Sequence, residues 1–254
     1  MNQAQLLEEK RDFSEKDLID LDWGKIPKHI AIVMDGNRRW ARFHNLPINM
    51  GYIAGAEALT NIVRVASKLG VETITAYTFS TENWNRTQEE VDTLMELFQT
   101  YLVKQRLPMK ADGVRFDAIG DISKLPSSLQ DEIISTKEFT ADCSTINLVL
   151  ALNYGSRDEI CRAIKKMFQD YQNNLLEKEI DEKIVSQYLD TSPYRDPDLL
   201  IRTSGEFRLS NFLLWQISYS EVCVSKAFWP DFSAQNLLEA ILEYQNRIRR
   251  HGGA

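Results

Sequence analysis

A carboxylate, a glycine and a group of arginines follow an apolar run near the start of the chain. Residues 30–34 are apolar and strand-like, and they lead directly into Asp35 and Gly36. A turn from a strand into a helix presents free backbone N–H groups and the positive end of the helix to an anion, and a glycine lets the main chain approach it closely. The arginines that can add charge-assisted hydrogen bonds to the same anion are Arg38, Arg39 and Arg42.

Asp35 itself indicates a metal ion. A carboxylate beside a polyphosphate repels it unless a cation lies between them, so Asp35 predicts Mg²⁺ shared between protein and substrate. The usual nucleotide-binding patterns, Gly-x-x-x-x-Gly-Lys-Ser/Thr and Gly-x-Gly-x-x-Gly, are absent. A phosphatase whose own aspartate becomes phosphorylated during the reaction would carry a second acid two residues further on, where this chain has Asn37. The alternative is an ordinary strand end followed by a solvated basic helix.

Strand-like and helical patterns alternate along the chain and must position these residues. The expected strands are 30–35, 73–80, 114–120, 145–153, 198–202 and a sixth near Val222, and the expected helices are 54–69, 91–107, 125–139, 156–171 and 234–249. The helical segments repeat apolar residues at intervals of three and four. This alternation predicts an α/β fold with a mostly parallel six-stranded sheet, helices on both faces and the active site at the carboxyl ends of the strands.

The polar residues that follow the strands are expected to form one site, because the carboxyl ends of parallel strands meet at one edge of the sheet. They are Asp35, 80–86, 153–155 and 202–210. One group of arginines follows the first strand and another follows the fifth, which indicates two anionic groups bound side by side. The sequence therefore predicts a reaction between two phosphorylated molecules.

Two apolar stretches accompany this polar set. Residues 91–102 carry a wide apolar helical stripe, and residues 146–152 form an almost uninterrupted apolar strand. Core packing explains both stretches, and a tunnel for a lipid chain would give the same pattern. Both interpretations stay open at this level.

Composition limits the class of protein. The 254 residues carry a formal net charge of -7, which disfavours sequence-independent binding to nucleic acid. The three cysteines are widely separated and lack metal-ligand spacing, and no apolar run is long enough to span a bilayer. We therefore expect a cytoplasmic protein with an N-terminal arm at residues 1–22 and a single catalytic domain at 23–254.

Three long segments, at 34–41, 79–86 and 201–216, resemble the cis-prenyltransferase family, and most closely its undecaprenyl diphosphate synthases, or isoprenyl transferases. The resemblance runs from about His29 to Arg250. It implies a Mg²⁺-dependent transferase that condenses isopentenyl diphosphate repeatedly onto an allylic diphosphate such as farnesyl diphosphate, with new double bonds in cis. The implied product is a long-chain polyprenyl diphosphate, such as undecaprenyl diphosphate for the cell-wall carrier lipid. A homodimer with at most peripheral membrane contact is also implied.

The resemblance assigns roles residue by residue. Asp35 would handle Mg²⁺ and the allylic diphosphate, Asn83 would assist proton removal, and Glu221 would be a second Mg²⁺ carboxylate, often supplied near the partner subunit. The loop that cradles the allylic diphosphate is Gly36, Asn37, Arg38 and Arg39. The residues of the substrate-covering segment are Trp40, Ser80, Asn83, Trp84 and Arg86, and those that hold isopentenyl diphosphate are Arg202, Arg208 and Ser210. Further substrate-binding residues are Thr81, Glu82 and Leu209.

The chain departs from the family pattern at several phosphate-binding positions. Ile48 and Tyr52 stand where relatives often have arginine and histidine, and Phe207 replaces a frequent histidine. Arg38 stands where bacterial members often have glycine, and its charge can compensate for a lost cation.

Two alternatives remain at this level. One is a family member that makes a shorter or a dolichol-length product. The other is a non-catalytic partner subunit of a prenyltransferase complex, which would be marked by lost phosphate ligands. Asp35, Asn83, Arg202 and Arg208 are all present, which argues against the second alternative.

Overall fold

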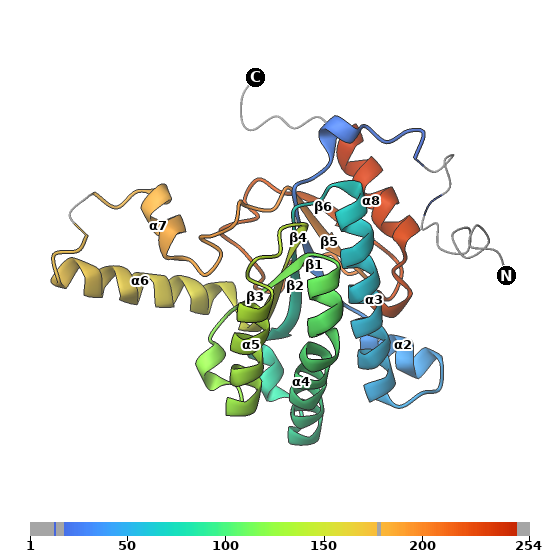
Figure 1. The fold of residues 1–254 in the computed structure, drawn as a ribbon, viewed down its shortest axis with the longest axis horizontal. Coiled ribbons are helices and arrows are strands. Elements are labelled where there is room, and N and C mark those ends of the chain that lie inside the picture. The colour runs from blue at the N-terminus through green and yellow to red at the C-terminus, as the bar shows by residue number, and fades with distance from the viewer. Residues whose placement is uncertain (1–12, 14–17, 177–178, 248–254) are drawn as a thin grey trace.

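Six strands form one parallel sheet in the computed structural model, which describes residue 13 and residues 18–176 and 179–247 (Figure 1). The strands are β1 (His29–Val33), β2 (Thr73–Ser80), β3 (Val114–Ile119), β4 (Ile146–Tyr154), β5 (Leu199–Arg202) and β6 (Glu221–Val224). Their order across the sheet is β3-β4-β2-β1-β5-β6. The predicted six-stranded parallel sheet is confirmed.

Helices connect the strands in the described part of the chain. The α-helices are α2 (Asn37–Phe43), α3 (Ile48–Leu69), α4 (Gln88–Ala111), α5 (Ser127–Phe139), α6 (Ser156–Gln172), α7 (Glu182–Tyr188) and α8 (Ala234–Asn246). The 3₁₀ helices are η1 (Trp23–Lys25), η2 (Thr81–Asn85), η3 (Ile122–Lys124) and η4 (Trp229–Asp231). The short α7 was not expected, and α3 begins at Ile48 rather than at residue 54. Glycines at 51 and 55 weaken the helical pattern there, but packing overrides propensity.

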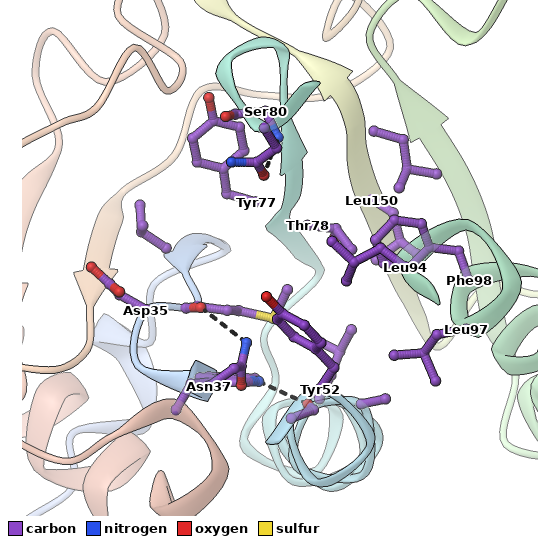
Figure 2. A pocket seen from close by; sticks show the side chains of 18 of the residues that line it. Asp35, Asn37, Tyr52, Tyr77, Thr78, Ser80, Leu94, Leu97, Phe98 and Leu150 are labelled. Atoms are coloured by element: carbon purple, nitrogen blue, oxygen red, sulfur yellow. Dashed lines mark hydrogen bonds between the residues drawn. The ribbon is translucent and has the colours of Figure 1, made fainter. Parts of the chain in front are cut away.

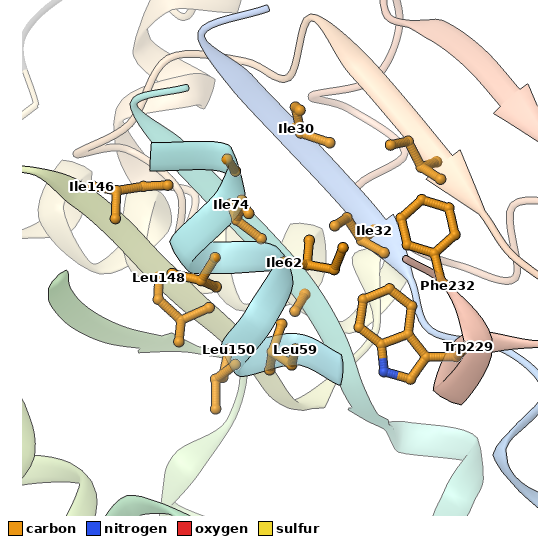
Figure 3. Packing of buried hydrophobic residues seen from close by; sticks show 14 of the residues in the cluster. Ile30, Ile32, Leu59, Ile62, Ile74, Ile146, Leu148, Leu150, Trp229 and Phe232 are labelled. Carbon is orange, nitrogen blue, oxygen red and sulfur yellow. The ribbon is translucent and has the colours of Figure 1, made fainter. Parts of the chain in front are cut away.

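One face of the sheet is covered by α3, α4, α5 and α8. Residues of alternating strand positions, such as Ile30 and Ile32 of β1, pack there against Leu59 and Ile62 of α3 and against Trp229 (Figure 3). Each of these side chains is at most 3% exposed. Successive side chains of a strand point to opposite faces, so the neighbouring residues of β1 face the other side.

The second face is covered by the start of α6 and by the segment between β5 and β6. Ala31 and Val33 of β1 lie there in a cluster with Phe212 and Leu213. The carboxylate of Glu159 on α6 accepts a hydrogen bond from the Gln216 side chain at 3.1 Å, which ties the helix to this segment. Both faces of β1 are therefore buried, which explains its continuous apolar sequence.

The predicted N-terminal arm, residues 1–22, lies largely outside the described residues. Of its described part, Leu21 is buried, and Phe13 and Leu18 pack against the main core. No helix among the described residues combines the length and apolar character needed to cross a bilayer.

Candidate active site

The turn after β1 is held by the loop that follows β5. The main-chain oxygen of Asp35 accepts hydrogen bonds from Thr203 Oγ1 at 2.6 Å, from Ser204 Oγ at 2.9 Å and from the main-chain N–H of Trp229 at 3.0 Å. Gly36 has a φ of 108°, and a Cβ there would lie 2.1 Å from Ser204 Oγ. Only glycine fits this turn, because both the backbone conformation and the space exclude a side chain.

Arginines surround the carboxylate of Asp35. Arg39 Nη2 donates to Oδ1 at 2.9 Å, and Arg202 Nη2 donates to Oδ2 at 3.0 Å. Arg208 Nη2 lies 3.8 Å from Oδ2. Burial raises the pKa of the Asp35 carboxyl, but the hydrogen bonds from Arg202 and Arg39 outweigh this effect and hold the pKa below its usual value. Asp35 is therefore a carboxylate at neutral pH.

The two groups of arginines predicted to converge do so through shared carboxylates. Glu206 accepts from Arg39 Nη1 at 2.6 Å and also from Arg208. Arg202 is 4% exposed, and its Nη1 donates to Ser210 Oγ at 2.8 Å and to the main-chain oxygen of Arg208. Arg202 Nε is buried and has no hydrogen-bond partner among the described residues. A buried donor without a partner is costly, so an anionic ligand would relieve it.

A cavity of about 550 Å³ opens beside these groups. Figure 2 shows Asp35, Asn37 and Ser80 on its polar side and Leu94, Phe98 and other apolar side chains opposite. Its polar lining includes Asp35, Asn37, Ser80, Glu82, Asn83, Arg86, Arg202 and Ser210. Its apolar lining includes Leu59, Leu94, Leu97, Phe98, Leu102, Leu150 and Leu152. Part of the apolar stripe of α4 thus lines a cavity, and several of its residues also belong to the core.

A second cavity, of about 250 Å³, is lined mainly by polar groups. Its residues are Met34, Asp35, Gly36, Asn37, Arg38, Arg39, Arg42, Tyr52 and Arg86. Met34, Asp35, Asn37, Tyr52 and Arg86 also line the larger cavity, so the two spaces adjoin. Together they suit a molecule with an anionic head and an apolar chain.

Close approach of α3 shapes this region. A Cβ on Gly51 would lie 2.1 Å from the main-chain oxygen of Asn37, and a Cβ on Gly55 would lie 2.4 Å from Asn37 Oδ1. The glycines four residues apart lie on one side of α3 and let it pack directly against the start of α2. Asn37 Oδ1 is buried and has no hydrogen-bond partner among the described residues.

Some predicted site residues line neither cavity. Trp40 Nε1 donates to Asp231 at 2.7 Å, and Trp84 Nε1 donates to Asn153 at 2.8 Å. Thr81 donates to its neighbour Glu82. Arg208 is half-exposed, and Leu209 is 39% exposed beside it. The roles assigned to these five residues stay predictions.

Mg²⁺ fits Asp35 but not the pair of Asp35 and Glu221 within one chain. Strand register pairs Leu199 with Glu221 and Arg202 with both Val33 and Val224. Glu221 therefore lies three residues, or about 10 Å, before the end of β6, whereas Asp35 lies beyond the end of β1. Its carboxylate accepts from Arg247 Nη1 at 2.9 Å. A Mg²⁺ ion held by one carboxylate and substrate phosphates needs only Asp35.

The residues 13, 18–176 and 179–247 contain no group of three or more histidine, cysteine, aspartate or glutamate residues placed to hold a metal ion. The metal role of Glu221 therefore stays a prediction that requires the partner subunit.

Two residues at the site, Tyr77 and Glu90, were not predicted from the sequence. Tyr77 lines the larger cavity, and Arg42, which the sequence placed with Arg38 and Arg39 as an anion-binding arginine, lines the smaller one. Glu90 accepts hydrogen bonds from Tyr52 and Arg86. Tyr77 and Glu90 lie within a strand and a helix, where nothing in the pattern separates them from ordinary structural residues.

Known proteins resemble this chain over nearly its full length. Residues 33–252 match the family described as "Putative undecaprenyl diphosphate synthase". An isoprenyl transferase of Clostridium tetani is 48% identical over 239 residues, which cover 94% of each chain. One of Chlamydia pneumoniae is 46% identical over 90% of this chain and 93% of its own.

A solved structure shares the fold. Lavandulyl diphosphate synthase from Lavandula x intermedia, in complex with dimethylallyl diphosphate, has a TM-score of 0.86 and 36% identity, covering 90% of this chain and 99% of its own. The parallel sheet, the arginine-rich edge and these similarities agree. The chain therefore belongs to the undecaprenyl diphosphate synthase family and is a prenyltransferase.

Proposed function

We propose that the enzyme condenses isopentenyl diphosphate repeatedly onto an allylic diphosphate, with cis double bonds, and releases a long-chain polyprenyl diphosphate such as undecaprenyl diphosphate. The observation that carries this proposal is the continuity of the two cavities. The smaller one holds arginines for a diphosphate, and the larger one leads past apolar side chains of α4 that suit an isoprenoid chain. Farnesyl diphosphate is the proposed primer.

The site has the groups that this chemistry needs. Breaking the bond between an allylic carbon and its diphosphate develops negative charge on the leaving group, which Arg39 and the other arginines of the smaller cavity stabilise. Mg²⁺, when bound through Asp35 and the substrate, would neutralise part of the same charge. The apolar wall excludes water from the reacting carbon. Ser80 and Asn83 line the same cavity.

Asn83 is held in a defined position for its proposed part in proton removal. Its side-chain oxygen accepts a hydrogen bond from the main-chain N–H of Ser80 at 3.0 Å, and the Ser80 side chain caps the same 3₁₀ helix, η2, in return. This reciprocal cap fixes the Asn83 side chain at the end of β2. The buried Arg202 and its partner Ser210 are the proposed site for the diphosphate of isopentenyl diphosphate.

A second copy of the chain is the proposed partner. The apolar side chains Ile164, Phe168, Tyr171 and Leu175 recur at intervals of three and four residues along α6 and just beyond it, and each is at least 55% exposed. Such a stripe is typical of a helix that packs against another element. Figure 1 shows α6 extending away from the sheet. Phe168→Asp should shift the sedimentation of a dimer toward that of a monomer, and a monomeric parent would contradict the proposal.

One incubation tests activity, class and product length together. The enzyme is given farnesyl diphosphate, labelled isopentenyl diphosphate and Mg²⁺, and the products are sized by chromatography. Labelled polyprenyl products in a narrow length range support the proposal, and a short or dolichol-length series would assign the alternative product class. The absence of any labelled product would favour the non-catalytic subunit.

A further inference from the structure

Tyr52 stands where the smaller and larger cavities meet. It belongs to α3, is 8% exposed and lines both spaces together with Arg86. Arg86 directly follows η2, and Glu90 lies in the first turn of α4. Contacts between Tyr52 and these two residues therefore tie α3 to the end of η2 and the start of α4.

The single hydroxyl hydrogen of Tyr52 is already used. The hydroxyl donates to Glu90 Oε1 at 2.5 Å and accepts from Arg86 Nη1 at 2.8 Å. A phenol has only one hydrogen to donate, so this hydroxyl cannot donate to a phosphate oxygen at the same time. Burial and the bond to Glu90 raise the pKa of Tyr52, so it keeps its proton at neutral pH.

Arg86 is held along one side only. Its Nη1 also donates to Glu90 Oε1 at 2.8 Å, which closes a triangle with the Tyr52 hydroxyl. Within the described residues, Arg86 Nε and Nη2 make no hydrogen bond. A guanidinium has five N–H groups in a rigid plane, so fixing one nitrogen orients the others. Because Arg86 lines the smaller cavity, these free groups are available to an anion there.

We propose that Tyr52 is a positioning residue: together with Glu90 it orients the Arg86 guanidinium toward a diphosphate in the smaller cavity and does not bind the diphosphate itself. This inference rests on the proposed function, since it concerns the same diphosphate. It differs from a simple replacement of the histidine that relatives often carry, because tyrosine acts here through an arginine. Arg38 forms an ion pair with the same carboxylate, since its Nη1 lies 3.6 Å from Glu90 Oε2.

A double-mutant cycle with inorganic diphosphate tests the proposal. Calorimetric titrations without divalent cations would give dissociation constants for the parent, Tyr52→Phe, Arg86→Ala and the double mutant. We expect Tyr52→Phe to weaken binding about five- to tenfold, since Arg86 loses one of the two hydrogen bonds that orient it, and Arg86→Ala to weaken binding more. In the Arg86→Ala background, Tyr52→Phe should change the constant by less than about twofold, because the residue it positions is gone.

Controls separate this inference from the proposed function and from loss of fold. Tyr188→Phe on α7 removes a comparable hydroxyl, which donates to Asp170 at 2.7 Å away from both cavities, and should leave the dissociation constant unchanged. Thermal unfolding followed by circular dichroism shows whether each variant folds. Equal effects of Tyr52→Phe in both backgrounds, or no effect in either, would overturn the positioning role. A parent that binds inorganic diphosphate neither without nor with Mg²⁺ would reject the proposed function, and the positioning role with it.

Discussion

The carboxylate of Asp35 and the guanidinium of Arg202 are hydrogen bonded at 3.0 Å, although 167 residues separate them in the chain. They meet because β1 and β5 are neighbours in the sheet and Val33 pairs with Arg202. Arg39 donates to the other oxygen of Asp35. One carboxylate therefore joins the two groups of arginines, and the two proposed diphosphate sites must lie side by side.

Replacing Asp35 should abolish turnover without unfolding the protein. We expect Asp35→Ala to lower kcat by roughly a thousandfold or more, because the proposed Mg²⁺ ligand is lost. The fold should survive, since the turn is held by the main-chain oxygen of Asp35 rather than by its carboxylate. Steady-state assays at saturating Mg²⁺ measure the effect. Turnover within a few fold of the parent would reject the metal assignment.

The arginines after β5 should affect one substrate more than the other. Arg202→Ala should weaken the apparent binding of isopentenyl diphosphate by about 1.5 to 3 kcal/mol. The KM for isopentenyl diphosphate should therefore rise much more than the KM for farnesyl diphosphate. Arg208→Ala should act in the same direction but more weakly, because its side chain is 57% exposed. Arg39→Ala should act mainly on farnesyl diphosphate.

The matched control for these arginines is Arg106→Ala. Arg106 forms an ion pair with Glu132 outside both cavities, so neither KM should change. Equal increases for both substrates in the Arg202 variant would mean that the two diphosphates share one site.

Gly51 should tolerate no side chain. Gly51→Ala would place a Cβ 2.1 Å from the main-chain oxygen of Asn37 and must therefore displace the start of α2. We expect a loss of about 1 to 3 kcal/mol in the free energy of unfolding, as for overpacking of a tight contact, together with weaker binding of farnesyl diphosphate. Gly24→Ala is the control, because its Cβ would meet only the Asp22 side chain, at 3.2 Å. Chemical denaturation and ligand titration measure both effects, and a Gly51 variant as stable as the Gly24 variant would contradict the packing.

Buried His29 should make the stability fall in mild acid. Burial lowers its pKa from 6.5 to about 4, while the ring contacts the main-chain oxygen of Arg195 and the hydroxyl of Thr75. As the pH falls from 6.5 toward 4, His29 binds a proton in the unfolded chain but not in the folded chain. The free energy of unfolding is therefore highest above this range and falls within it. The loss should approach about 3 kcal/mol.

The comparison variant for this prediction is His29→Gln, which keeps polar groups at the site but does not titrate. Urea denaturation at several pH values between 4 and 7 gives the unfolding free energy of each protein. The difference in unfolding free energy between parent and variant should narrow steadily toward acid, because only the parent loses stability through His29. A constant difference across this range would show that His29 does not titrate in this way.

Much of this protein was determined by local sequence. Alternating apolar runs and helical patterns were enough to predict the parallel sheet, because burial of both faces demands apolar strands and amphipathic helices. The rule that ligands bind at the carboxyl ends of parallel strands placed Asp35, Asn83 and Arg202 in one site. In the structure, these three residues all line the larger cavity.

Only the tertiary structure decided which polar groups face a ligand and which face each other. Sequence spacing cannot show that the Tyr52 hydroxyl is taken by Glu90, or that Glu221 lies near the opposite end of the sheet from Asp35, since both depend on contacts between distant elements. The same holds for Trp40, which donates to Asp231 of η4 instead of lining a cavity. A hydrogen bond forms only within a narrow range of donor–acceptor distances, and the packing of the helices on the sheet sets those distances.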